Sequence, residues 1–329
     1  MQSLNLDVVA TRGPLVESRH HVHAAVVDGT GRLVASAGDP ALVTHARSCA
    51  KPFQVMPFIE DGGFDGLRWG DDQLALACAS HGGEPEHVAI ASSMLDSIDL
   101  EEGDLACGPH DPLTTRGQRI LRESGERPTR LHNNCSGKHA AMLAHATTAG
   151  WPTYGYERAE HEVQRVILRS LAVWASIPER EIQLAVDGCG VVVFILPLEA
   201  MARAYARFAT VAEERDAVAR RIAHAMATRP FLVGGTDRFD TVLIEETRGR
   251  VISKVGAEGV HAVALRDQGL GLTVKVEDGA SRAQHPAVLR ALQQLGALPD
   301  PLPPRLQEFL RRPLRNTRGE VVGEVMPVA

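Results

Sequence analysis

Strand-type residue patterns occur at both ends of this chain, and helical patterns fill the middle. Near the N-terminus, β-branched residues between Leu6 and Gly38 predict strands joined by a tight turn at Asp28-Gly29-Thr30-Gly31. Near the C-terminus, short apolar segments separated by glycine turns predict strands at 250–255, 259–265 and 269–276. Strands from both ends that flank a helical middle predict an α+β fold, an α/β sandwich with one mainly antiparallel sheet.

The same patterns predict how the chain is divided. We expect one unit over residues 1–329, with the sheet part at about 1–66 and 231–329 and the helical part at about 67–230. Further expected elements, in chain order, are helices at about 160–174 and 198–226, a short apolar strand at 191–196, a helix at about 284–295 and a last strand at 321–325.

The composition limits the class of protein. Of the 329 residues, 44% are hydrophobic and 23% are charged, which is typical of a globular protein with a large core. The formal net charge is -6, and lysine and arginine are scattered along the chain. This distribution argues against a nucleic-acid or membrane-surface partner and favours a small-molecule partner.

Cysteine usage and the apolar pattern bear on the cellular compartment. The chain has five cysteines, an odd and sparse set that fits a reducing compartment better than a disulfide framework. We find no basic and apolar leader pattern and no apolar run of bilayer length. We therefore expect a cytoplasmic protein.

A serine and a lysine stand three residues apart at Ser48 and Lys51, just before Pro52. At this spacing on a helix the amine can reach the hydroxyl, and Pro52 is tolerated mainly in a first turn. A lysine whose pKa is lowered by burial or by a second cation can activate a serine as a nucleophile. The alternative is a helix-capping serine beside a surface lysine, so the motif needs companions.

A second serine, Ser80, follows an apolar run and precedes Gly82 and Gly83. Glycines after a serine allow the close backbone approach that an exposed active-site hydroxyl or a substrate carboxylate requires. The segment leads into an expected helix after Pro85. The alternative is a plain turn with a capping serine.

A lysine, Lys254, ends a β-rich segment and is followed by the small residues from Val255 to Gly259. This pattern resembles the K-T-G element that accompanies S-x-x-K in serine β-lactamases and penicillin-binding proteins. On a strand, Lys254 could face the serine helix and lower the pKa of Lys51 or anchor a substrate carboxylate. The alternative is a lysine that protects an edge strand.

A dense polar cluster at His132–His139 opens an expected helix of small residues, and Asp187–Gly190 precedes the apolar strand at 191–196. Cys135 in the first segment and Cys189 in the second could meet at a metal ion. Two cysteines with a nitrogen ligand and an open fourth position would suit zinc. The alternative is a pair of buried, inert cysteines.

Taken together, these motifs closely resemble the rhizobial-type L-asparaginase II family, whose fold is similar to serine β-lactamases and glutaminases. The resemblance extends over nearly the whole chain, from the first hairpin to Gly279. The motifs that carry it are Arg47-Ser48-Cys49-Ala50-Lys51, Ser80-His81-Gly82-Gly83, the segment 132–139, Asp187-Gly188-Cys189-Gly190 and the segment 254–259.

The resemblance implies hydrolysis of L-asparagine to L-aspartate and ammonia by a homodimer. It implies two serine-lysine pairs, Ser48 with Lys51 and Ser80 with Lys254, as the catalytic residues. It further implies a zinc ion bound by Cys135, Lys138 and Cys189, with Arg47, Asp187 and His139 as substrate-binding residues. Two acidic residues, Asp237 and Asp240, depart from the family pattern, and we expect them to affect substrate fit rather than the catalytic set.

The expected chemistry is acyl transfer. Ser48 attacks the side-chain amide carbon, Lys51 takes its proton and passes it to the departing ammonia, and water hydrolyses the resulting ester. Ser80 and Lys254 assist the movement of protons, and the choice between Ser48 and Ser80 as the attacking serine stays open. Two other functions remain open at this stage, a penicillin-recognising or other amide hydrolase with the same residues and a non-catalytic protein that binds an amino acid or zinc.

Overall fold

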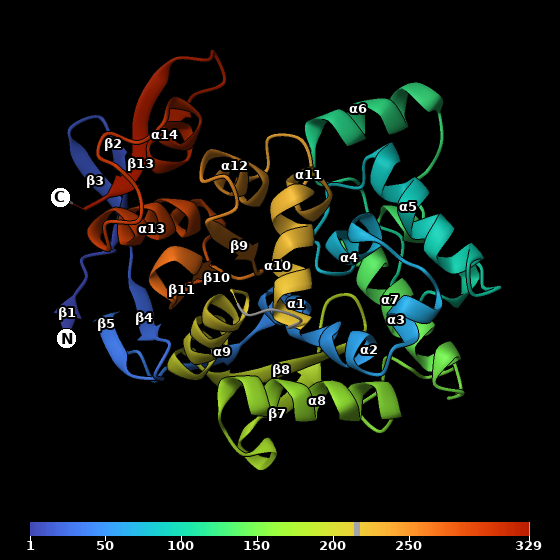
Figure 1. Cartoon of the computed structure of the whole chain (residues 1–329). Helices are drawn as coiled ribbons and strands as arrows, with labels where there is room; N and C mark the ends of the chain where they lie inside the picture. Colours follow the sequence, from blue (N-terminus) through green and yellow to red (C-terminus); the bar gives the residue numbers. More distant parts are fainter. Residues whose placement is uncertain (214–217, 329) are drawn as a thin grey trace.

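The centre of the protein is a six-stranded sheet built from both chain ends (Figure 1). The computed structural model describes residues 1–213 and 218–328, and every element below lies there. In spatial order the strands are β1 (Gln2–Ser3), β5 (Leu33–Ala37), β4 (Val22–Asp28), β11 (Leu270–Val276), β10 (Val260–Leu265) and β9 (Val251–Val255). Neighbouring strands are antiparallel except for the short parallel pair β1 and β5. The predicted α+β class and its mainly antiparallel sheet are confirmed.

The two chain ends meet along β4 and β11 in the middle of this sheet. Their register runs from Leu270 opposite Asp28 to Val276 opposite Val22. The predicted hairpin is β4 and β5, and the carboxylate of Asp28 accepts hydrogen bonds from the backbone N–H groups of Thr30 and Arg32 in its turn. The N-terminal strands therefore cannot complete the sheet without the C-terminal ones.

One helix covers each face of the sheet. Helix α9 (Leu198–Val211) packs on β4, β10 and β11, and α13 (Ser281–Gln294) packs on the opposite side. The approach of α9 is close because Gly271 on β11 has no side chain, and a Cβ atom there would overlap the backbone of Ala202 and Ala206. Each face of the sheet is thereby shielded from water.

A second, four-stranded sheet lies on the far side of α13. Its order is β12 (Arg312–Arg315), β13 (Val321–Pro327), β2 (Val8–Arg12) and β3 (Leu15–His20). The prediction of one sheet was therefore wrong in this respect, because the expected last strand at 321–325 pairs with β2 instead of joining the central sheet. Helix α13 contacts β2, β13 and the central sheet, so its apolar residues fill the space between the two sheets.

The helical part lies beside the central sheet and contains a small third sheet, of order β6 (Val43–His45), β8 (Val192–Pro197) and β7 (Gln183–Val186).

The expected helix at 198–226 is divided into α9 and α10, with residues 214–217 outside the described part of the chain. The remaining α-helices are α1 (Lys51–Gln54), α2 (Met56–Glu60), α3 (Gly63–Gly66), α4 (Asp71–Ala77), α5 (Pro85–Asp96), α6 (Thr115–Ser124), α7 (Ser136–Thr148), α8 (Glu162–Ala175), α10 (Val218–Thr228), α11 (Pro230–Val233), α12 (Phe239–Glu246) and α14 (Pro304–Leu310). Short 3-10 helices are η1 (Arg47–Ala50), η2 (Glu102–Asp104), η3 (Arg130–His132), η4 (Glu179–Glu181) and η5 (Arg266–Gln268).

One apolar core joins the helical part to the sheet. Buried residues of α1, α4, α7 and α9 belong to the same cluster as Ile252, Val260 and Ala262 of the sheet. Within the described ranges, every helix is too short or too polar to cross a lipid bilayer. The continuous core fixes the helical part against β9, which is where the polar cluster described below lies.

We predict that Gly271→Ala lowers the free energy of unfolding by about 1–3 kcal/mol, the usual cost of overpacking a close contact. The added methyl group would force α9 away from β11, since its neighbours are backbone atoms that cannot rotate aside. The matched control is Gly66→Ala, because a Cβ there meets no atom within 4 Å. Urea unfolding measures both changes, and equal stability of the two variants would contradict the packing described here.

Candidate active site

A cavity of about 600 Å³ opens where the helical part meets the sheet. Its wall includes η1, the segment after α4, the start of α7, the turn between β7 and β8, the start of α12 and the end of β9. Residues of α13 and α14 also line it. Segments that are far apart in the sequence thus contribute side chains to one concave surface, which is the usual form of a small-molecule site.

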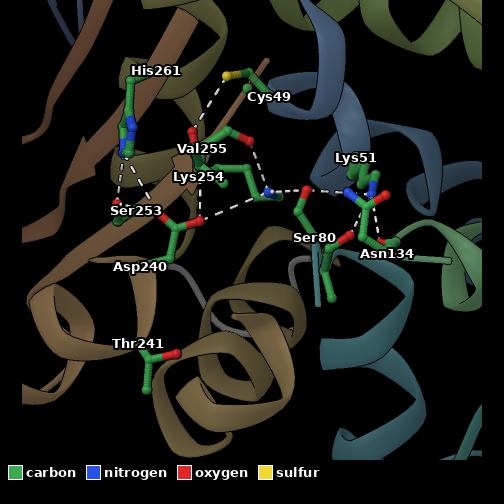
Figure 2. A network of polar contacts seen from close by, with 12 residues as sticks. Cys49, Lys51, Ser80, Asn134, Asp240, Thr241, Ser253, Lys254, Val255 and His261 are labelled. Carbon is green, nitrogen blue, oxygen red and sulfur yellow. Dashed lines mark hydrogen bonds and ion pairs between the residues drawn. The ribbon is translucent and has the colours of Figure 1, made fainter. Parts of the chain in front are cut away.

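The hydroxyl group of Ser80 lies between two buried lysine amines at this wall, as Figure 2 shows. Lys254 Nζ is 2.8 Å from Ser80 Oγ, and Lys51 Nζ approaches it from the other side at 3.4 Å. Ser80 is 3% exposed, Lys51 1% and Lys254 0%. Among the described residues the structure therefore brings together three of the four predicted catalytic residues through direct hydrogen bonds.

Two backbone contacts fix the segment of Lys51 against the strand that carries Lys254. Cys49 Sγ is 3.3 Å from the carbonyl oxygen of Lys254, and Tyr205 of α9 donates to the carbonyl oxygen of Cys49 at 2.8 Å. Pro52 occupies the first turn of α1, as its missing N–H predicts, but α1 begins only at Lys51, and Ser48 lies in the preceding 3-10 helix η1 instead of on the same α-helix. The positions of the two amines are thus set by packing between η1, α9 and β9.

Ser48 lines the same cavity but does not form the predicted pair with Lys51. Within the described residues its half-buried hydroxyl group makes no hydrogen bond. The amine of Lys51 is directed elsewhere, because it donates to the carbonyl oxygens of Ala79 and Asn134 as well as to Ser80. A separation of three residues alone did not determine which hydroxyl the lysine contacts.

A buried carboxylate that the sequence analysis did not assign to the catalytic set lies behind Lys254 (Figure 2). Asp240, at the start of α12, is 2% exposed and lies 3.8 Å from Lys254 Nζ. It accepts hydrogen bonds from Ser253 Oγ at 2.7 Å and from the backbone N–H of Val255 at 2.9 Å, and His261 Nε2 is 3.4 Å away. The available signal was a charged residue in the first turn of α12, just before the apolar residues Val242–Ile244.

The environment of Lys254 makes its amine easier to deprotonate than an ordinary lysine. The pKa of Lys254 falls to about 8, chiefly because burial disfavours the charged amine. The positive charge of Lys51 acts in the same direction, whereas the negative charge of Asp240 opposes it. Cys49 also faces Lys254, and burial raises the pKa of its thiol to about 12, so the thiol stays neutral. Lys254 is therefore suited to accept a proton from Ser80.

Arg47 and Asp187 form an ion pair on the cavity wall. Arg47 Nε lies 2.8 Å from Asp187 Oδ1, and both residues line the cavity. Burial alone would raise the pKa of Asp187, but the charges of Lys138 and Arg47 lower it, so the carboxylate is ionised. The backbone of Arg47 has a φ of 47°, an unusual conformation for a residue other than glycine. The structure thus brings two of the three predicted substrate-binding residues to the cavity.

His139, the third of these residues, lies behind the wall. It is fully buried in α7 and is not among the residues that line the cavity. Its Nδ1 atom is 2.6 Å from the hydroxyl group of Tyr156, and burial lowers its pKa to about 3. The first turn of α7 directs this side chain into the core, where it supports the packing of the neighbouring residues.

Cys135, Lys138 and Cys189 converge next to Asp187. Lys138 Nζ is 3.0 Å from Cys189 Sγ, and Cys135 and Cys189 both line the cavity. The neighbouring thiol of Cys135 and the charge of Lys138 lower the pKa of Cys189 to about 4 although burial opposes them, which favours the thiolate. The pKa values of Lys138 and Cys135 are raised, so both must lose a proton to the metal before the two sulfur atoms and the amine could hold a zinc ion with an open position toward the cavity.

Lys138 is essential to that donor set. Over residues 1–213 and 218–328, no group of three histidine, cysteine, aspartate or glutamate side chains lies close enough to hold a metal ion. Cys107, a third buried thiol, does not line the cavity and points to the carbonyl oxygen of Arg130, 3.8 Å away. The residues that fit zinc are therefore the three that the sequence resemblance implied.

The fold and the cavity define an α+β protein with a buried serine-lysine cluster at the edge of its central sheet. Comparison with protein families matches residues 8–327 to L-asparaginase II. The chain therefore belongs to the L-asparaginase II family.

Solved structures and curated sequences complete the comparison. The structure of Mglu in its native form has a TM-score of 0.47 and 16% identity over 84% of this chain and 64% of Mglu, which is less than two thirds of the length of that protein. A β-lactamase from Mycobacterium bovis has a TM-score of 0.40 and 13% identity over 84% of this chain and 93% of its own. No curated protein sequence matches the chain.

We predict that kcat/KM for amide hydrolysis rises as the pH increases through about 8, because Lys254 must lose its proton before it can act as a base. Asp240→Asn should move the midpoint to lower pH, since it removes a negative charge that favours the ammonium form of Lys254. The pH dependence of kcat/KM measures both effects.

Asp237→Asn is the matched control. Asp237 lines the same cavity three residues earlier but is exposed, and its φ of 56° is tolerated by asparagine. The pH midpoint of kcat/KM in Asp237→Asn should equal that of the unmodified protein. A midpoint that stays constant or rises in Asp240→Asn would contradict the role given to Asp240.

Proposed function

We propose that this protein is an L-asparaginase that hydrolyses L-asparagine to L-aspartate and ammonia. The observation that supports this most strongly is the hydroxyl group of Ser80, which is held between the amines of Lys254 and Lys51 at the cavity wall. Family membership supports the reaction type, since the family is described as L-asparaginase II. A serine beside a lysine of lowered pKa is an arrangement suited to nucleophilic attack on an amide.

In the proposed mechanism, Ser80 Oγ attacks the side-chain amide carbon of asparagine while Lys254 accepts the hydroxyl proton. The proton then passes to the departing nitrogen, ammonia leaves, and an aspartyl ester remains on the serine. Water, deprotonated by the same lysine, hydrolyses the ester and releases aspartate. Lys51 holds the hydroxyl group from the other side and places positive charge near the developing oxyanion.

The nucleophile proposed here differs from the sequence prediction, which placed attack at Ser48. Ser80 is favoured because its hydroxyl is in contact with a base, whereas that of Ser48 makes no hydrogen bond in the described part of the chain. Ser48 lines the cavity, so a role in binding the substrate is the simplest one for it. The prediction that Ser48 attacks is tested directly by comparing the two serines.

We predict that Ser80→Ala lowers kcat for ammonia release at least about a thousandfold, because the acyl-enzyme can no longer form. Ser48→Ala should lower it about 10- to 100-fold through weaker positioning of the substrate. Urea unfolding of both variants shows whether the fold is retained. Loss of activity in folded Ser48→Ala with near-normal activity in Ser80→Ala would reverse the assignment.

The substrate itself is tested by measuring ammonia release from asparagine and glutamine and hydrolysis of a chromogenic β-lactam side by side. The proposal requires turnover of asparagine. Hydrolysis of the β-lactam without ammonia release would favour a penicillin-recognising enzyme, and saturable binding of asparagine without turnover would favour a non-catalytic binding protein. Either result would contradict the proposed function.

A zinc ion bound by Cys135, Lys138 and Cys189 is part of the proposal. When bound, it would supply a Lewis acid beside the cavity that orients the amino-acid end of the substrate. The thiolate of Cys189 and the short distance from Lys138 Nζ to its sulfur, 3.0 Å, support this donor set. Asp187, which Lys138 and Arg47 keep ionised, lies beside it and would contact the substrate amino group.

We predict that the purified protein contains about one zinc ion per chain, and that Cys189→Ser and Lys138→Met lose most of it. Cys107→Ser is the control, since this buried thiol lies outside the cavity wall and its variant should keep the metal. Elemental analysis gives the metal content. Zinc retained in Lys138→Met would exclude the proposed donor set, and unchanged activity after chelation would limit the ion to a structural role.

The homodimer and the cytoplasmic location remain predictions. We propose the dimer on the family resemblance alone. Sedimentation equilibrium gives the assembly directly, with a mass about twice the 35.5 kDa of one chain expected for the dimer. A mass equal to that of one chain would contradict it.

A further inference from the structure

Arg238 is a cation on the cavity wall that has no anionic partner in the described part of the chain. It is the residue that caps the start of α12, and its backbone N–H donates to the carbonyl oxygen of Gly235. Its half-buried guanidinium group makes no hydrogen bond and no ion pair with residues 1–213 or 218–328. An arginine with five unused donors beside a cavity is a ready site for a planar anion.

The other cations of the cavity are engaged or exposed. Lys51 and Lys254 contact Ser80, and Arg47 is paired with Asp187. Arg312 also lines the cavity, but it is exposed on β12, where water screens its charge. Arg238 is therefore the cation of this wall, within the described residues, that is both shielded from water and free to bind a ligand.

Arg238 lines the same cavity as Ser80 and His285 of α13. Burial is the main cause of the lowered pKa values of His81, next to Ser80, and of His285 on α13, and the charge of Arg238 contributes to both shifts. The guanidinium group therefore lies within electrostatic range of the imidazole groups of His81 and His285. The buried carboxylate of Asp240 accepts hydrogen bonds from Ser253 and Val255 and makes none with Arg238.

Within residues 1–213 and 218–328, no anion forms a hydrogen bond with the half-buried guanidinium group of Arg238. Partial removal of water lowers the pKa of Arg238, because the charged form loses solvation and Asp240 only partly offsets the loss. A half-buried charge without a hydrogen-bonded partner destabilises the free protein. A ligand that carries a carboxylate would restore two charge-assisted hydrogen bonds to the guanidinium group and remove that cost.

We propose that Arg238 binds the α-carboxylate of the amino-acid substrate and thereby restricts the enzyme to asparagine that has a free carboxyl group. This inference rests on the proposed function and adds the substrate class to it. With the carboxylate on Arg238, the amino group is left for Asp187 and the side-chain amide for Ser80. Asparagine whose carboxyl group is amidated, or is joined to a following residue in a peptide, would lack the anion and bind poorly.

The test compares Arg238→Met with Arg312→Met on two substrates, L-asparagine and L-asparagine α-amide, with products separated by chromatography. Arg238→Met should raise KM for asparagine about 10- to 100-fold, the effect of losing hydrogen bonds to a charged group, with a smaller change in kcat. Its KM for the α-amide should stay unchanged, so the preference for asparagine shrinks by the same factor. Arg312→Met should keep both values, and Arg238→Lys should recover only part of the loss.

An equal rise of KM for both substrates, or a preserved preference for asparagine in Arg238→Met, would overturn the inference while leaving the asparaginase activity in place. Absence of turnover in the unmodified protein would instead contradict the proposed function. In that case the affinity for L-aspartate, measured by calorimetry, still tests the role of Arg238. Binding that is lost in Arg238→Met and kept in Arg312→Met supports it, and equal binding by both variants contradicts it.

Discussion

Two buried lysine amines on one serine hydroxyl are the feature on which the rest of this site depends. Lys51 and Lys254 are almost fully removed from water, and both contact Ser80. Two neighbouring cations in a buried site are unfavourable unless one loses its proton or an anion compensates them. The structure uses both solutions, because the pKa of Lys254 is lowered and Asp240 lies 3.8 Å from its amine.

Part of this arrangement could be predicted from the sequence. The hairpin around Asp28 and the strands on either side of Gly259 were predicted because their residue patterns are local and their turns contain glycine. Ser80 and Lys254 were identified because each stands beside small residues that leave the backbone open. Their meeting required only that the strand of Lys254 lie next to the segment after α4, and the shared core provides this.

The remainder depends on packing that no local pattern records. Lys51 turns away from Ser48 because three acceptors from distant segments, including the carbonyl oxygen of Asn134, surround its amine. Asp240 contacts Lys254 only because α12 packs against β9. The last strand, near Val325, joins a second sheet because α13 separates it from the first, and its own sequence is compatible with either sheet.

The central claim is that Ser80 carries the acyl group during turnover. The most direct measurement is acid quenching of the enzyme during reaction with asparagine, followed by peptide mapping with mass spectrometry. The account predicts an aspartyl ester on the peptide that contains Ser80, absent from the Ser80→Ala variant. An ester on Ser48, or on any other residue while Ser80 stays unmodified, would contradict it.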